Sequence, residues 1–119
     1  MSTNERDSNV IRAVNPIAAV TSNGAPQPGQ SHRSSGNFSL ENAPPGITKV
    51  QWFVTDNSNS SNIVFDVMED KSLWPDPTIW TGLSNGCITD LEVSRSFYIA
   101  NPKNTGGDTF VVQIWPYSG

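Results

Sequence analysis

The sequence has a single cysteine, Cys87, and a single histidine, His32. One cysteine cannot form a disulfide within the chain, so we expect the fold to be held by packing and hydrogen bonds alone. A zinc site needs three or four ligands, and one residue of each type is too few. A Ser-His-Asp arrangement would have to recruit its histidine from a polar segment. We therefore expect no enzyme activity, no metal site and no cofactor.

Basic residues are also scarce. Seven Lys and Arg stand against eleven Asp and Glu, which gives a formal net charge of −4 and a pI of about 4.6. Proteins that bind nucleic acid need a basic surface to replace counterions, and anionic membranes attract basic segments. The charge therefore excludes a nucleic acid as partner and argues against electrostatic docking on anionic lipid.

Long apolar runs are missing as well. No run approaches the roughly 18 residues that a membrane-spanning helix needs, so we expect no transmembrane segment. The first residues, MSTNERDSNVIRAV, have no apolar core typical of a secretory signal. We expect synthesis in the cytoplasm, with a final location in an assembled particle or after release by a non-classical route.

Aromatic residues are absent from the first 37 residues, and all eleven lie between Phe38 and Tyr117. Ser22–Gly36 is rich in Gly, Ser and Pro and has neither a helical nor a strand period. A segment without aromatic residues has little to build a core from. The sequence therefore predicts an extended polar N-terminal arm over residues 1–37 and a β-sandwich body over residues 38–119.

The body shows the two-residue apolar alternation of strands and no useful helical period. Ile47–Asp56 and Asn62–Glu69, joined by a polar turn, are expected to form a hairpin. The other expected strands are Gly36–Leu40, Gly86–Val93, Ser96–Ala100 and Thr109–Tyr117. Short strands at this spacing predict an all-β fold, a small antiparallel β-sandwich or jelly roll with an extended N-terminal arm.

The polar turn between the two strands of the expected hairpin, Asp56–Asn62, is rich in oxygen ligands. Calcium takes six to eight oxygens, several of them charged. This loop offers one carboxylate, Asp56, and Glu69 and Asp70 of the following segment could add two more. A plain turn is therefore favoured over an ion site.

The stretch WPDPTIW, residues 74–80, is the main candidate for binding. Pro75 and Pro77 remove two backbone donors and hold the chain extended, so Trp74 and Trp80 project from a stiff loop. The rings either cap the core or lie exposed, where they would contact sugars, lipid headgroups or a protein. Asp76 would then accept hydrogen bonds. Trp115 and Tyr117, beside Pro116, raise the same alternatives.

Two functions fit these patterns. The first is a non-catalytic structural or assembly subunit of capsid-associated, filament or sheath type, which self-associates or binds a protein partner through its arm and sheet edges. The alternative is a small lectin-like or toxin-component module that binds a glycan or a membrane surface through the Trp74/Trp80 loop. Both predict a protein that works by interaction.

Overall fold

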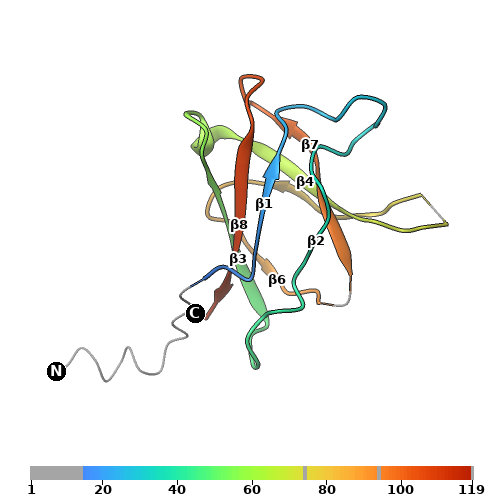
Figure 1. The fold of residues 1–119 in the computed structure, drawn as a ribbon. Helices are drawn as coiled ribbons and strands as arrows, with labels where there is room; N and C mark the ends of the chain where they lie inside the picture. Colours follow the sequence, from blue (N-terminus) through green and yellow to red (C-terminus); the bar gives the residue numbers. More distant parts are fainter. Residues whose placement is uncertain (1–14, 74, 94, 119) are drawn as a thin grey trace.

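The computed structural model describes residues 15–73, 75–93 and 95–118 (Figure 1). In these ranges it contains eight strands and one 3-10 turn, η1 (Ser60–Asn62). The strands are β1 (Ala18–Ser22), β2 (Phe38–Ser39), β3 (Lys49–Thr55), β4 (Val64–Glu69), β5 (Thr78–Leu83), β6 (Ile88–Asp90), β7 (Ser96–Lys103) and β8 (Phe110–Tyr117). No helix in the described part of the chain is long and apolar enough to cross a bilayer.

The strands form two four-stranded sheets that pack face to face. The first sheet has the order β1-β8-β3-β6 and the second β2-β7-β4-β5, and every pairing is antiparallel. Strands adjacent in sequence thus fall in different sheets, except β4 and β5. This strand order is that of a jelly roll, in which two Greek keys share one core. The predicted all-β sandwich is confirmed.

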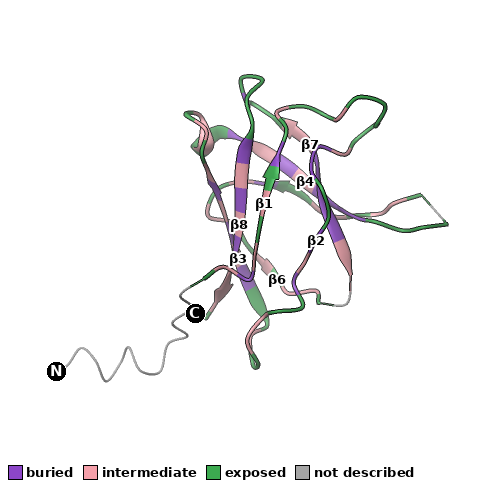
Figure 2. Ribbon diagram, in the orientation of Figure 1, coloured by how far each residue is buried: buried purple, intermediate pink, exposed green. Residues whose placement is uncertain are grey.

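Alternation along the strands explains how they bury one face. In β3 every second residue, Val50, Trp52 and Val54, is buried while the residues between them are partly or fully exposed. β8 repeats the pattern with Phe110, Val112 and Ile114. Figure 2 shows the same alternation of buried and half-buried positions along β8. Because successive side chains point to opposite faces of a sheet, each of these strands presents one apolar side to the opposite sheet.

Aromatic rings fill the space between the sheets. Trp52 contacts Phe38 and Phe65 edge to face, with ring centroids 6.3 and 6.2 Å apart. Phe110 lies 6.2 Å from Phe65. Such arrangements add to the stabilisation that burial of the ring area provides. The core is therefore built from both sheets at once.

The expected hairpin of β3 and β4 does not form, so that prediction is wrong. β3 pairs with β8 over seven residue pairs, while β4 pairs with β7 and β5 in the other sheet. The turn after Thr55 carries the chain from one sheet to the other. Its polar residues indicate that the chain turns here. They do not indicate whether the strands before and after the turn pair with each other or with other strands.

Residues 15–37 are part of the sandwich, which differs from the predicted arm. β1 pairs with β8 along five residues, and Ile17 joins the core. Ser34 and Ser35 are buried, and their hydroxyls bond to the backbone of Ile99 at 3.2 and 2.8 Å. Small hydroxyl side chains thus fix this segment where no aromatic ring does. The rest of the predicted arm, residues 1–14, lies outside the described residues.

Candidate functional site

A polar groove lies on the outer face of the second sheet, between that sheet and the segment that leads into β2. It has a volume of about 560 Å³. Its lining comes from this segment, from the end of β4 with the loop after it, and from β7. The lining residues are Gln30, Ser31, His32, Arg33, Met68, Asp70, Pro75, Asp76 and Tyr98.

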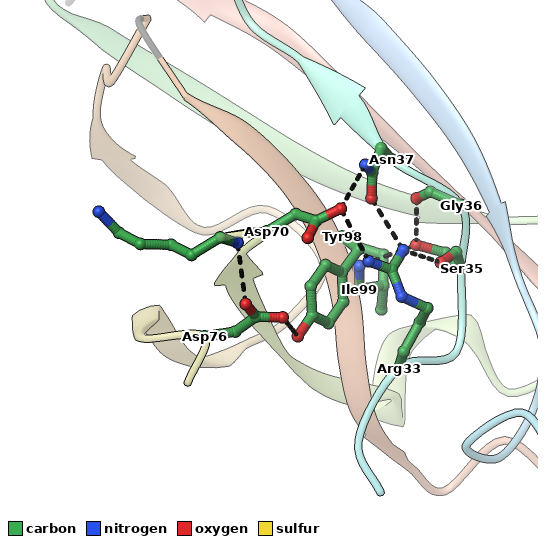
Figure 3. Close-up of polar contacts among 9 residues, drawn as sticks. Arg33, Ser35, Gly36, Asn37, Asp70, Asp76, Tyr98 and Ile99 are labelled. Carbon is green, nitrogen blue, oxygen red and sulfur yellow. Dashed lines mark hydrogen bonds and ion pairs between the residues drawn. The ribbon is translucent and has the colours of Figure 1, made fainter. Parts of the chain in front are cut away.

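Arg33 occupies the centre of the polar contacts in this groove (Figure 3). Its guanidinium carbon lies 3.8 Å from the centre of the Tyr98 ring, a cation–π contact. Its Nη1 donates to the Ser35 carbonyl at 3.1 Å and to Asn37 Oδ1 at 2.8 Å, and its Nη2 lies 3.2 Å from Asp70 Oδ2. An isolated Arg33–Ala100 bridge adds a backbone link to β7. Arg33 therefore fastens the covering segment to the sheet.

Asp70 is held from several sides, but one of its oxygens is left over. Its Oδ2 accepts from Arg33 and, at 2.7 Å, from Asn37 Nδ2. Its backbone N–H donates to the Ser96 carbonyl at 2.8 Å, which fixes the residue at the end of β4. Oδ1 has no hydrogen-bond partner among the described residues, so it remains an acceptor for a ligand.

Asp76 ties the loop between β4 and β5 to the sheet. Tyr98 donates its hydroxyl to Asp76 Oδ2 at 2.5 Å, and the backbone N–H of Lys71 donates to Oδ1 at 2.8 Å. These two hydrogen bonds, with help from nearby Arg33, lower the pKa of Asp76. Burial and the hydrogen bond to Asp76 raise the pKa of Tyr98. Asp76 is therefore ionised at neutral pH and both of its oxygens are engaged.

A second chain of hydrogen bonds positions His32. Its Nδ1 lies 3.0 Å from Asn101 Oδ1, and Asn101 Nδ2 donates to Asp66 Oδ2 at 2.9 Å. Burial tends to raise the pKa of Asp66, but hydrogen bonds from Asn101, the Gly82 N–H and the Thr81 hydroxyl outweigh it and lower that pKa. Asn101 has φ of 51°, a left-handed conformation that asparagine tolerates better than most residues. The imidazole Nε2 has no partner among the described residues.

The five predicted site residues do not form one site. Asp76 lines the groove, and Trp74 lies outside the described residues. Trp80 packs into the core, with its ring centroid 5.3 Å from Trp52 and 5.2 Å from Phe97. This position corresponds to the core-cap interpretation of that tryptophan.

Trp115 and Tyr117 belong to the other side of the molecule. Both are half-buried on β8 of the first sheet, in register with Gln51 and Lys49 of β3. They alternate with inward Ile114, so they point away from the core. Trp115 Nε1 donates to Gln113 Oε1 at 2.9 Å. They are therefore separated from the groove by the whole thickness of the sandwich.

Sequence reasoning missed Arg33 and Tyr98, and it considered Asp70 only as a possible ion ligand. The alternation in Ser96–Ala100, with Phe97 and Ile99 inward, does place Tyr98 on the outer face. Nothing in the sequence pattern shows that a segment more than 60 positions earlier crosses that face. His32, assigned to the polar arm, is exposed as expected but bonded to Asn101.

The polar loop after β3 acts as a turn. Asn57 Nδ2 donates to the Thr105 carbonyl at 3.1 Å, and Asn59 Nδ2 to the Asn104 carbonyl at 2.6 Å, which joins this loop to the one before β8. Asn57 Oδ1 accepts from the Asn59 N–H and Asn59 Oδ1 accepts from Asn62 Nδ2, both at 2.8 Å, so fewer side-chain oxygens are left for an ion. Among the described residues, no three His, Cys, Asp or Glu side chains cluster closely enough to hold a metal.

The fold and the groove together define a jelly-roll β-sandwich with a polar groove on one outer face. Comparisons of the chain with protein-family models, with curated proteins and with solved structures return no match. A jelly roll carries many unrelated functions, so the function has to be inferred from the groove itself.

Proposed function

We propose that this protein is a non-catalytic carbohydrate-binding protein and that a short glycan binds in the groove on the second sheet. The observation that carries the proposal is the groove's lining: one tyrosine ring, one thioether, one proline and six polar or charged side chains. Pockets for apolar small molecules are lined mainly by apolar side chains. A groove with this lining favours a ligand that is itself dense in hydroxyl groups.

The charges favour a neutral ligand. Arg33 is the one basic residue in the lining of a groove that also holds Asp70 and Asp76, and its guanidinium already donates to three oxygens. A phosphate or a carboxylate would meet two negative side chains there, and like charges repel. Sugar hydroxyls instead donate to carboxylates and to the unprotonated nitrogen of an imidazole, and they accept from amide N–H groups.

The groove is also organised before any ligand arrives. Hydrogen bonds fix Asp70, Tyr98 and His32, while Asp70 Oδ1 and His32 Nε2 are left without partners among the described residues. Ordering side chains on binding opposes association, and a preformed site avoids much of that loss. These two atoms are the groups that we expect to bond the ligand directly.

Binding without hydrolysis is supported by the carboxylates. Cleavage of a glycosidic bond needs one carboxyl group that stays protonated near neutral pH. Hydrogen bonds lower the pKa of Asp76, so this groove carboxyl does not suit the role of a general acid. We therefore propose that the ligand is held and not cleaved.

A glycan array followed by calorimetric titration tests the proposal. We expect saturable binding of at least one neutral oligosaccharide, weakened at least tenfold by His32→Ala and by Asp70→Ala. Asp90→Ala is the matched control because Asp90 is also an ion-paired aspartate, on the other sheet, 2.7 Å from Lys49. An array without any binding, or equal losses for Asp70→Ala and Asp90→Ala, would contradict the proposal.

Self-association is the second candidate, and it now depends on the first sheet. The described part of the predicted arm, residues 15–37, pairs within its own chain, so we place the proposed contact on the first sheet. The outer face of the first sheet carries half-buried Trp115 and Tyr117, with Ile88 43% exposed nearby on β6. Light scattering of the full chain and of Trp115→Ser tests this role: a concentration-dependent oligomer lost in the variant supports it, and a monomer throughout removes it.

A further inference from the structure

The loop between β4 and β5 projects an apolar side chain into solvent. Leu73 is 84% exposed, the highest exposure of any large apolar residue in the described part of the chain. In the sequence it is followed by a tryptophan and Pro75, and Pro75 is exposed too. Figure 1 shows this loop extending beyond the strands of both sheets, at the right of the picture. Leu73 and Pro75 are therefore apolar, accessible positions near the end of this loop.

The base of this loop is clamped. The Glu69 N–H donates to the Pro77 carbonyl at 3.0 Å, and the Lys71 N–H donates to Asp76 Oδ1 at 2.8 Å. Asp76 in turn accepts from the Tyr98 hydroxyl. Because the two legs of the loop are joined to each other and to the sheet, Leu73 is held out on a supported hairpin. An exposed leucine is not in itself unusual, but a supported one at a tip can enter an apolar phase at little entropic loss.

A second exposed apolar residue lies in a neighbouring loop. Val93, 45% exposed, is in the connection from β6 to β7. Arg95 from the same connection donates to Glu69 Oε1 at 2.6 Å, which ties it to the end of β4 where the projecting loop starts. Two of the three most exposed large apolar residues among those described therefore sit in loops at one end of the sandwich.

The proposed glycan groove opens beside this tip. Pro75 and Asp76, which follow the tip in the chain, also line the groove. A polar groove and an apolar projection on the same loop would meet the two parts of a glycolipid, the sugar headgroup and the bilayer that carries it. The short tip suits the shallow depth to which interfacial side chains enter a membrane.

We propose that the groove's ligand is a glycan displayed on a lipid bilayer, and that the Leu73 tip inserts into that bilayer while the groove holds the headgroup. This inference rests on the proposed function, since it names where the same ligand is found. The net charge of −4 favours a zwitterionic surface over an anionic one. A bilayer is favoured over a protein partner because the charged groups beside the two apolar loops are paired with one another: Glu69 with Lys71 and Arg95, and Arg95 with Glu92.

Vesicle co-sedimentation provides the test. The probe is a phosphatidylcholine vesicle that contains a glycan coupled to a phosphatidylethanolamine anchor. The glycan is the one that the protein binds most tightly on the array. We expect Leu73→Asp to weaken vesicle binding at least tenfold and to leave titration with the same free glycan unchanged. Ile88→Asp is the matched control, an exposed apolar residue away from this end, and we expect it to behave as the unmodified chain does.

The outcomes separate the two proposals. If Leu73→Asp binds the vesicles as tightly as the unmodified chain while the free glycan still binds, insertion is overturned and glycan binding stands. If no glycan binds, the proposed function fails and this inference fails with it.

A fluorophore reports the insertion directly. In a Cys87→Ser background, a nitrobenzoxadiazole label attached through Leu73→Cys should shift to the blue and brighten when vesicles are added. The same label attached through Ser58→Cys, in the exposed loop at the other end of β4, should not change. An unchanged spectrum at position 73, with vesicles bound, would overturn the insertion of the tip.

Discussion

The outer faces of the two sheets carry similar residues in different settings. The second sheet is covered by the segment that contains Arg33, and the Arg33–Asp70 pair has side chains 21% and 35% exposed. On the first sheet the Lys49–Asp90 pair is open, with side chains 51% and 78% exposed. An ion pair screened by water contributes little, whereas one joined to a ring and to amide groups fixes a segment. The covering segment thus turns a flat sheet face into a groove.

Two tryptophans of the first sheet differ in whether they face the core or the outside of the sandwich. Trp52 is fully buried between the sheets, and its Nε1 donates to Thr89 Oγ1 at 2.9 Å. Trp115, which directly follows Ile114, the partner of Trp52 on the neighbouring strand, points outward and is half-buried. The two tryptophans lie in the same sheet but on opposite faces. Replacing each of them by alanine therefore compares the effect of burial on stability for the same type of side chain.

Trp52→Ala should have the largest effect. Removal of a fully buried ring leaves a cavity between the sheets, and the expected loss of unfolding free energy is about 3–5 kcal/mol. Trp115→Ala should lose about 1 kcal/mol or less, because its ring is on the outer face. Denaturant unfolding followed by circular dichroism measures both. Similar losses for the two variants would contradict the assignment of the faces.

Trp80→Ala should come next, with a loss of about 2–4 kcal/mol. Its ring is half-buried but contacts Trp52 and Phe97 in the core, so part of the burial and both aromatic contacts are lost. Thermal unfolding of the variant measures the change. A melting transition that does not move, together with weakened glycan binding, would make Trp80 a binding residue and overturn its role in the core.

Arg33→Ala should destabilise the protein by about 2 kcal/mol, since it removes the cation–π contact and leaves Asp70 and Asn37 without a shared partner. Lys49→Ala, the matched change on the first sheet, should alter stability by less than about 0.5 kcal/mol. Hydrogen exchange on the Ser34 N–H, which donates to the Ile99 carbonyl, shows whether the segment has come loose. Unchanged protection in Arg33→Ala would refute the fastening role.

Asp76→Asn should have the smallest effect, about 0.5–1 kcal/mol at neutral pH, because the lost charge-assisted hydrogen bonds are partly solvated. The folded-state pKa is lowered, so the contribution is present above the unfolded value of about 3.9 and is lost as pH falls through the folded value. The difference between the two proteins should therefore shrink below about pH 4. A difference that grows on acidification would show that the sign of the shift is wrong.

Much of the fold could be predicted from alternation within single strands. Val50, Trp52 and Val54 lie on one face because of their spacing, and the class of fold follows from six such segments. The pairing could not be predicted in this way. β3 lies beside β8 and β4 beside β7, and each partner strand lies far along the chain with other strands in between, where no local signal reaches.

The site was less accessible from the sequence because it depends on a segment that resembles a linker. Ser34 and Ser35 are small and polar, yet they are buried because their hydroxyls satisfy backbone groups of β7. Asp76 was recognised from the prolines on either side of it. Its partner Tyr98 could be placed on an outer face, but the arginine above that ring required the fold.

The measurement that tests the central claim most directly is a titration of the isotope-labelled protein with the array's tightest glycan, followed by amide chemical shifts. The groove predicts that the largest shifts occur at residues 30–33, Asp70 and Tyr98, with little change at Gln51, Trp115 and Tyr117. Shifts confined to the first sheet would contradict the claim and would place the ligand on the aromatic face instead.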